Sequence, residues 1–117
     1  MGMSTHWTDN QPIYLQLRDR AIAMILDGDL AEGDALPSVR NVAAEMQLNP
    51  LTVSKAYQVL VDDDLVEKKR GLGMFVREGA REALLAAERE KFLSEEWPHI
   101  EARVRRLGLS ASDLFAK

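Results

Sequence analysis

The sequence predicts a mainly α-helical chain that carries one small β-hairpin. Apolar residues recur at three- and four-residue spacing over most of its 117 residues, and prolines or N-capping side chains precede several of these patterns. One short stretch instead has the pattern of two strands around a pair of glycines. These signals in a chain of this length predict one compact domain, or one domain with a small appendage.

The first helix is predicted to begin at Pro12 and to end before Gly28, a residue that suits a left-handed C-cap. Its apolar residues form two stripes. One stripe consists of Tyr14, Leu17, Ala21 and Ile25, and the second of Leu15, Ile22 and Leu26. A helix that is apolar on two sides tends to be buried between neighbours, so we expect it between the next segment and the tail. Residues 1–9 are expected to form a flexible lead-in.

Two short helices joined by a tight turn follow. Ser38 is suited to cap the first, and Asn49 to cap the second, which has Pro50 in its first turn. The apolar faces consist of Val39, Val42, Ala43 and Met46 in the first helix, and of Val53, Tyr57, Leu60 and Val61 in the second. The residues of the second helix that point elsewhere are Leu51, Thr52, Ser54, Lys55 and Gln58. Their hydroxyl, amide and ammonium groups suit contacts with base edges and phosphates.

A basic hairpin is predicted directly after these helices. Its strands are residues 65–67 and 74–77, and between them lies Lys68-Lys69-Arg70-Gly71-Leu72-Gly73. The two glycines permit the positive φ values of a tight reversal, and the three cations suit a phosphate backbone or a minor groove. A solvated hairpin tip is the other interpretation. Helix, turn, helix and hairpin in this order make a winged helix-turn-helix, which places its second helix in the major groove of DNA.

Three motifs in this region resemble the GntR family of bacterial transcription regulators. They are Leu36-Pro37-Ser38-x-Arg40, then Asn49-Pro50-x-Thr52-Val53-Ser54-Lys55-Ala56-Tyr57, and finally Arg70-Gly71-x-Gly73-x-Phe75-Val76. The asparagine-proline pair and the short chain are most similar to the YtrA subfamily. The resemblance implies a winged helix-turn-helix DNA-binding domain over residues 10–77 and a short helical dimerisation or effector segment over residues 78–117. It also implies a repressor of its own operon, often one that encodes an ABC transporter.

The predicted DNA contacts come from both helices and from the hairpin. They are Ser38, Arg40, Asn49, Leu51, Thr52, Lys55, Tyr57, Lys68, Lys69, Arg70, Gly71 and Gly73. Asn49 is first an N-cap, with a phosphate contact as its second role, and Tyr57 is first a core residue whose hydroxyl can still reach a phosphate. Leu51 stands where the subfamily usually has a second asparagine, and Leu72 replaces a frequent wing lysine.

The net charge of −4 runs against DNA binding at first sight, because phosphate contacts supply much of the affinity of DNA-binding proteins. Residues 1–77 contain 8 Lys and Arg against 11 Asp and Glu. The cations nevertheless gather on the proposed DNA face, whereas the acids gather in residues 27–34 and 62–64 and are expected to face away. A winged helix that binds a protein is the alternative. The helix dipole does not explain the acidic residues 62–64 at a helix end.

The tail, residues 78–117, is rich in helix formers and carries an apolar seam. The seam residues follow steps of 4, 3, 4 and 3, as in a coiled coil, and are Leu93, Trp97, Ile100, Val104 and Leu107. Pro98 predicts a kink or two helices, Gly108 a helix end, and Ser110 with Asp113 a capping box. We expect the seam to pair two chains into a homodimer on an inverted-repeat operator. The alternative is that it folds back onto Leu15, Ile22 and Leu26 of its own chain.

Other classes of function find little support in the sequence. There is no cysteine, no nucleophile–base pairing, no metal-ligand spacing and no cofactor fingerprint, so no enzyme, metal site or cofactor is predicted. His6 and His99 are far apart in sequence. The absence of a bilayer-spanning run and of a signal-peptide pattern predicts a cytoplasmic protein. The resemblance implies that it is bacterial and is associated with the nucleoid when bound to its operator. Whether a small-molecule effector binds is left open.

Overall fold

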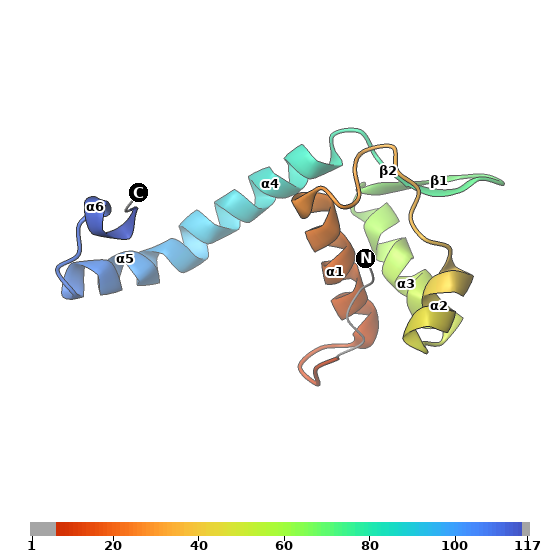
Figure 1. The fold of residues 1–117 in the computed structure, drawn as a ribbon, viewed down its shortest axis with the longest axis horizontal. Helices are drawn as coiled ribbons and strands as arrows, with labels where there is room; N and C mark the ends of the chain where they lie inside the picture. Colours follow the sequence, from red (N-terminus) through yellow and green to blue (C-terminus); the bar gives the residue numbers. More distant parts are fainter. Residues whose placement is uncertain (1–6, 116–117) are drawn as a thin grey trace. The chain divides into compact units, whose positions relative to one another are not determined.

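The computed structural model describes residues 7–115, and its helices and strands follow one another as shown in Figure 1. They are α1 (Ile13–Asp27), α2 (Val39–Met46), α3 (Pro50–Asp62), β1 (Val66–Lys69), β2 (Gly73–Val76), α4 (Ala80–Lys91), the π-helical turn η1 (Phe92–Glu96), α5 (Trp97–Arg106) and α6 (Ala111–Leu114). The predicted class, mainly α with a small hairpin, is confirmed. The chain divides into two compact units, one ending at Leu84 and one beginning at Leu85.

Helix α1 follows the predicted pattern closely. It begins after Pro12 and ends at Gly28, which has a φ of +89° and closes the helix through a backbone bond to the carbonyl of Ile25. The stripe that contains Leu17 and Ala21 is buried in the core. The second predicted stripe is half-buried. One face of α1 therefore holds it against the rest of the first unit.

Trp7 and Thr8, in the segment that the sequence predicted to be a flexible lead-in, contact α1. The buried side-chain amide of Gln16 donates to the carbonyl oxygens of Thr8 and Gln11 at 2.8 and 2.7 Å, and its Oε1 accepts from the Thr8 N–H at 2.9 Å. A buried amide needs such partners, and here the preceding segment supplies them. The Arg20 guanidinium also lies 3.8 Å from the ring centroid of Trp7. Residues 1–6, with His6, lie outside the described residues.

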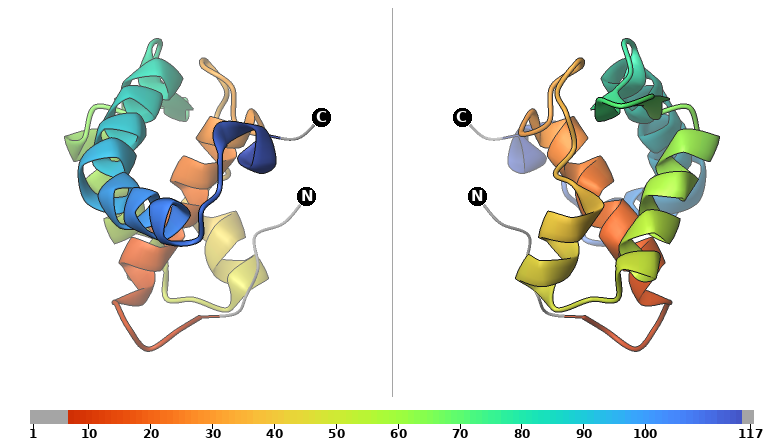
Figure 2. Two further views of the ribbon diagram at one scale, coloured as in Figure 1. Left: turned by 90° about the vertical axis from the view of Figure 1, so that its left-hand side faces the viewer. Right: turned by 90° about the vertical axis from the view of Figure 1, so that its right-hand side faces the viewer.

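Helix α3 is the central element of the first unit and contacts both α1 and α2, whose arrangement Figure 2 shows from two sides. Val53, Ala56 and Leu60 on its inner face are 0% exposed. The turn before it is short, because Gln47 ends α2 with a φ of +55° and the Leu48 N–H donates to the Ala43 carbonyl at 2.9 Å. The predicted helix, tight turn and helix are confirmed.

The hairpin strands extend further toward the tip than the sequence predicted. The first strand begins at Val66, rather than at residue 65, and pairing continues to Lys69 opposite Gly73. Only residues 70–72 form the tip, which the Leu72 N–H closes by donating to the Lys69 carbonyl at 2.9 Å. Residues 33–36 also bond to β2: the Leu36 N–H donates to the Met74 carbonyl at 2.8 Å. One edge of β2 is therefore covered.

The acidic end of α3 has a structural role. Asp64 adopts a φ of +60°, a left-handed conformation that Asp tolerates better than most residues, and this turns the chain from α3 toward β1. Its carboxylate lies 3.4 Å from a guanidinium nitrogen of Arg77, which follows β2. The pair lies at the base of the hairpin, where the Arg77 N–H also donates to the Leu65 carbonyl at 2.9 Å. Asp64 therefore helps to join α3 to the hairpin.

The first turns of α4 belong to the first unit, which thus extends past residue 77. Ala80 is buried and Leu84 packs against the core. The Gly79 N–H donates to the Glu32 carboxylate at 2.8 Å, and Arg81 Nε donates to the Leu26 carbonyl at 3.0 Å.

In the second unit, the predicted interruption near Pro98 is confirmed in the form of a π-helical turn. The Trp97 N–H donates to the carbonyl of Phe92, five residues earlier, so η1 contains one residue more than an α-helical turn would. Gly108 follows α5 with a φ of +68°, and Ser110 and Asp113 form the predicted capping box before α6. The hydrogen bonds from Ser110 lower the pKa of the Asp113 carboxyl. These local signals placed the helix ends correctly.

Candidate nucleic-acid interface

The outward face of α3 presents the residues predicted to contact bases. Leu51, Ser54, Lys55 and Gln58 are exposed and Thr52 is half-buried. The ammonium group of Lys55 lies 4.2 Å from the ring centroid of Tyr14 in α1, a cation–π contact that holds the side chain on the α1 side of this face. Thr52 and Lys55 are three residues apart and share that side.

The two helix caps fix the start of α2 and of α3. The Ser38 hydroxyl accepts from the Asn41 N–H at 3.1 Å, and Asn49 Oδ1 accepts from the Leu51 N–H at 2.9 Å. Both side chains are exposed, and both cap a helix as the sequence predicted. Arg40, the second residue of α2, is exposed beside Ser38.

Tyr57 lies in the core of the first unit, where its side chain is 3% exposed. Its O–H donates to the carbonyl of Pro37 at 2.7 Å, so it ties α3 to the segment that leads into α2. Burial raises the pKa of the Tyr57 phenol from 10.0 to about 12, because the phenolate would be poorly solvated there. We interpret Tyr57 as a residue that positions the start of α2, and Ser38 and Arg40 with it.

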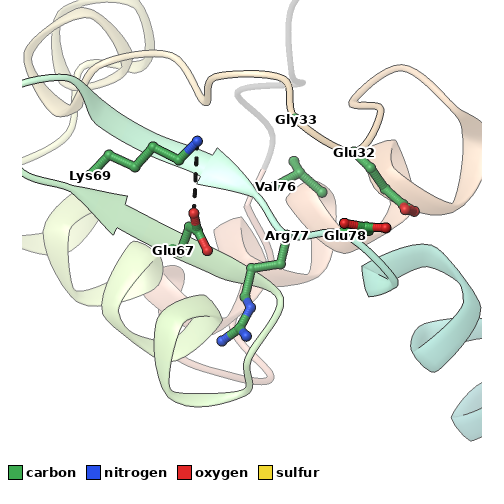
Figure 3. Close-up of a pocket in the computed structure, with 7 residues that line it drawn as sticks. All are labelled: Glu32, Gly33, Glu67, Lys69, Val76, Arg77 and Glu78. Atoms are coloured by element: carbon green, nitrogen blue, oxygen red, sulfur yellow. Dashed lines mark ion pairs between the residues drawn. The ribbon is translucent and has the colours of Figure 1, made fainter.

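The alternation of side chains along the hairpin separates its two lysines. Lys68 lies opposite Met74 on the face that also contains the buried Val66, toward α3. Lys69 lies on the other face, where Figure 3 shows its side chain directed toward Glu67. The Lys69 Nζ is 3.8 Å from Glu67 Oε1 and 4.8 Å from the ring centroid of Phe75. Both lysines line the groove beside α3, but the ammonium group of Lys69 is already engaged by Glu67.

A shallow groove runs between α3 and the hairpin and brings several predicted residues together. It is lined by Leu36, Pro37, Val39, Ser54, Tyr57, Lys68, Lys69, Gly71, Gly73 and Met74. Arg40 instead borders a separate depression over α2, beside Leu48 and Pro50. The groove brings Ser54, on the outward face of α3, next to the hairpin.

A second depression lies behind the hairpin and is drawn in Figure 3. Its lining combines three carboxylates with two cations: Glu32, Glu67, Glu78, Lys69 and Arg77, besides Gly33 and Val76. The Glu32 carboxylate is already used by the Gly79 N–H. Mixed charge of this kind does not favour a polyanion, so the face with the groove is the better candidate for a nucleic-acid surface.

The predicted seam of the tail lies on α5 and η1, with Leu93, Ile100 and Leu107 exposed and Trp97 and Val104 half-buried. The sequence pattern did not include Phe92, whose ring centroid lies 6.3 Å from that of Trp97. A seam counted in steps of three and four assumes α-helical geometry, whereas the π-helical turn places residues five apart near each other. The sequence signal that could have identified Phe92 as a seam residue is its position as an aromatic residue shortly before Pro98.

Neither a metal cluster nor a membrane-spanning helix is present in the part of the chain that the structure describes. Within residues 7–115, no group of three or more His, Asp or Glu side chains is arranged to hold a metal ion. None of the helices in that range is both long and apolar enough to span a bilayer.

Comparison with known proteins agrees with this geometry. Residues 13–76 match the model of the bacterial regulatory proteins of the gntR family. Over 113 residues the chain is 30% identical to YhcF, an uncharacterised HTH-type transcriptional regulator of Bacillus subtilis, covering 97% of this chain and 92% of YhcF. It is 40% identical over 74 residues to the HTH-type transcriptional repressor YtrA of the same organism, covering 63% of this chain and 57% of YtrA. A GntR family transcriptional regulator from Listeria monocytogenes superposes with a TM-score of 0.72 at 26% identity, over 94% and 95% of the two chains.

The chain therefore belongs to the GntR family, and it is a transcriptional regulator with a winged helix-turn-helix DNA-binding domain rather than an enzyme. Within the family it is YtrA-like. The resemblance predicted from the three sequence motifs is confirmed.

Replacing Tyr57 with Phe should lower the free energy of unfolding by about 1–3 kcal/mol at neutral pH, because the Pro37 carbonyl would lose its partner. Urea unfolding measures this change. Tyr14→Phe is a matched control, since no hydrogen bond of the Tyr14 hydroxyl is found in the described part of the chain. An equal loss in both variants would contradict the positioning role.

The same tyrosine predicts a pH dependence. The unfolded chain releases the Tyr57 proton near pH 10.0, whereas the folded protein holds it to about pH 12. Folding stability should therefore fall as the pH rises between these values. Tyr57→Phe should lack this part of the loss, which urea unfolding at both ends of the interval can resolve.

Proposed function

We propose that the protein represses transcription by binding an inverted-repeat operator as a homodimer. In this proposal α3 enters the major groove and the hairpin contacts the neighbouring backbone or minor groove. The observation that carries the proposal is the groove in which Ser54, on the outward face of α3, lies together with Lys68, Lys69 and the glycines of the wing. This arrangement would allow α3 to lie in the major groove of DNA while the hairpin contacts the phosphates beside that groove.

The proposed contacts divide into two classes. Arg40, Thr52 and Lys55 are candidates for base or phosphate contact, with Leu51 at the tip of α3. Lys68 and Arg70, with the exposed main chain of Gly71 and Gly73, are candidates for contact with the DNA backbone.

Ser38 and Asn49 lie at the starts of α2 and α3, where free N–H groups suit a phosphate. Because the remaining surface is acidic overall, the binding energy would come from this one face, and affinity should depend steeply on salt.

The homodimer is proposed from the tail. Leu93 and Leu107 are 59% and 61% exposed, and Phe92 and Ile100 are exposed as well. An apolar stripe of this length on a helix usually marks a partner surface. A second copy of the chain would cover it through a two-fold axis and present two α3 helices to the two halves of an inverted repeat.

The charges beside the seam favour an antiparallel arrangement of the two α5 helices. With Trp97 and Val104 at a positions of the heptad, Glu96 and Arg103 occupy g positions and Glu101 occupies an e position. An antiparallel pair that packs Trp97 against Ile100 of the second copy brings Glu96 close to Arg103. A parallel pair in register would place Glu96 near Glu101, two like charges. Charge complementarity therefore selects the antiparallel pair.

The regulated genes and the cellular location are proposed from the family. A relative of this chain is named a repressor, and the resemblance to the YtrA subfamily favours control of the protein's own operon, including an ABC-transporter operon. Such a regulator would act in the bacterial cytoplasm, at the nucleoid when bound to its operator. A small-molecule effector would act by changing the spacing of the two α3 helices in the dimer.

A winged helix that binds protein is the second candidate, and the net charge of −4 favours it. Mobility-shift assays against genomic fragments separate the two candidates. We expect a small set of fragments to be retained, and sequencing them identifies the operator. Failure to retain any fragment at low salt would support the protein-binding candidate instead.

Replacing Arg40 or Lys55 with Ala should weaken operator binding by about 1–3 kcal/mol each if the side chain contacts a base edge or is buried against DNA. Folding should change little, although Lys55→Ala removes its contact with Tyr14, worth about 0.5–1 kcal/mol at an exposed site. Lys91→Ala, an exposed cation of the tail, is the control. Wild-type affinity in both variants would show that the DNA face has been placed wrongly.

Neutralising Lys68, Lys69 and Arg70 together should lower the affinity for all sequences and flatten its salt dependence, by about 0.9 in the logarithmic slope for each phosphate that the hairpin no longer neutralises. Sequence preference should survive, since phosphate contacts do not read bases. As single changes, Lys68→Gln should have a larger effect than Lys69→Gln, because Lys69 already contacts Glu67. A salt slope equal to that of the wild type would remove the hairpin from the interface.

Sedimentation should show a dimer at micromolar concentration, and a chain that ends at Leu84 should be monomeric with much weaker operator binding. Glu96→Arg should weaken the dimer by about 0.5 kcal/mol per ion pair, and adding Arg103→Glu should restore it. A parallel dimer would instead be strengthened by Glu96→Arg. A monomeric intact chain would favour the seam folded back onto α1.

A further inference from the structure

Two leucines of the winged helix are almost fully exposed. Leu51 at the start of α3 is 76% exposed and Leu72 at the tip of the hairpin is 73% exposed. Isolated apolar residues are common on protein surfaces, so exposure alone indicates little. Their positions are informative, because both lie on the elements proposed to contact DNA.

Leu51 is held in a defined place. It is the second residue of α3, and its N–H donates to Asn49 Oδ1 at 2.9 Å, within the cap that starts the helix. The preceding Pro50 has a fixed φ and begins the first turn. The backbone of Leu51 is thus rigid while its isobutyl group projects into solvent. N-terminal residues of a recognition helix are the ones that reach base edges in the major groove.

The chemistry of the leucine side chain limits what it can recognise there. The major groove presents hydrogen-bond donors and acceptors at every base pair, and leucine can satisfy none of them. The apolar feature of that groove is the C5-methyl group of thymine. We propose that Leu51 is a specificity-determining residue that packs against the C5-methyl group of a thymine in each half of the operator. The inference rests on the proposed function, in which α3 enters the major groove.

Leu72 provides a contrast within the same domain. It lies between Gly71 and Gly73 and beside Arg70, at the tip of the hairpin that is proposed to contact the backbone or the minor groove. The thymine methyl group is not displayed in the minor groove. Leu72 is therefore a matched control, because the residue type and the exposure are nearly the same but the groove is different.

The experiment replaces thymine by uracil, one position at a time in each half-site of the operator recovered by the fragment assay. This change removes the methyl group and leaves every hydrogen-bonding group of the base pair in place. Wild-type protein should lose about three- to tenfold in affinity per half-site at one thymine position, because the methyl group no longer packs against the leucine. Leu51→Ser should bind the thymine and uracil operators equally, whereas Leu51→Met and Leu72→Ser should keep the difference. Circular dichroism checks that all variants are folded.

The possible failures are distinguishable. If no fragment is retained by the wild type, the proposed function fails. If the operator is bound but no uracil substitution weakens binding, Leu51 reads no methyl group and the inference is overturned while the function stands. If Leu51→Ser retains the thymine preference, another residue reads that methyl group, which also overturns the inference.

Discussion

The burial of one face of α3 is the constraint on which the rest of the DNA-binding unit depends. Val53, Ala56 and Leu60 are wholly inaccessible to solvent, and the helix contacts α1, α2 and β1. A helix packed along one face has no freedom to rotate about its axis, so its opposite face is fixed as well. The polar surface of α3 is thus set by the apolar residues beneath it, and the hairpin is aligned with it through the contact between α3 and β1.

Alternation along a short strand decides which charges of the wing are available. Adjacent residues of β1 point to opposite faces, so Lys68 joins the side of α3 while Lys69 contacts Glu67 and Phe75. The sequence shows only three consecutive cations. The structure shows in addition that the two faces of the hairpin differ in charge. The face behind it carries the carboxylates of Glu32, Glu67 and Glu78.

Local signals made most of the fold predictable. The caps Ser38 and Asn49, the left-handed Gly28 and the break near Pro98 each depend on neighbours within a few residues, and each was recognised from the sequence. Longer-range contacts were not recognisable in this way. The bonds from Gln16 to Thr8 and from Tyr57 to Pro37 depend on how segments pack, and the role of Asp64 depends on Arg77 from beyond the hairpin. For the candidate DNA-binding surface, the sequence predicted a set of residues but not that Lys69, unlike Lys68, lies next to Glu67.

The two edges of the hairpin have different consequences for solubility. Residues 33–36 bond to β2 and cover that edge, whereas β1 has no further strand beside it among the described residues. Unpaired edge strands are templates for aggregation, and lysine is the residue that most often protects them. Lys68 and Lys69 both lie in β1. The cations proposed to contact DNA therefore also suit the protection of this edge against strand-to-strand association. A paralogue without them would need another protective feature, such as a proline or a bulge, at the same edge.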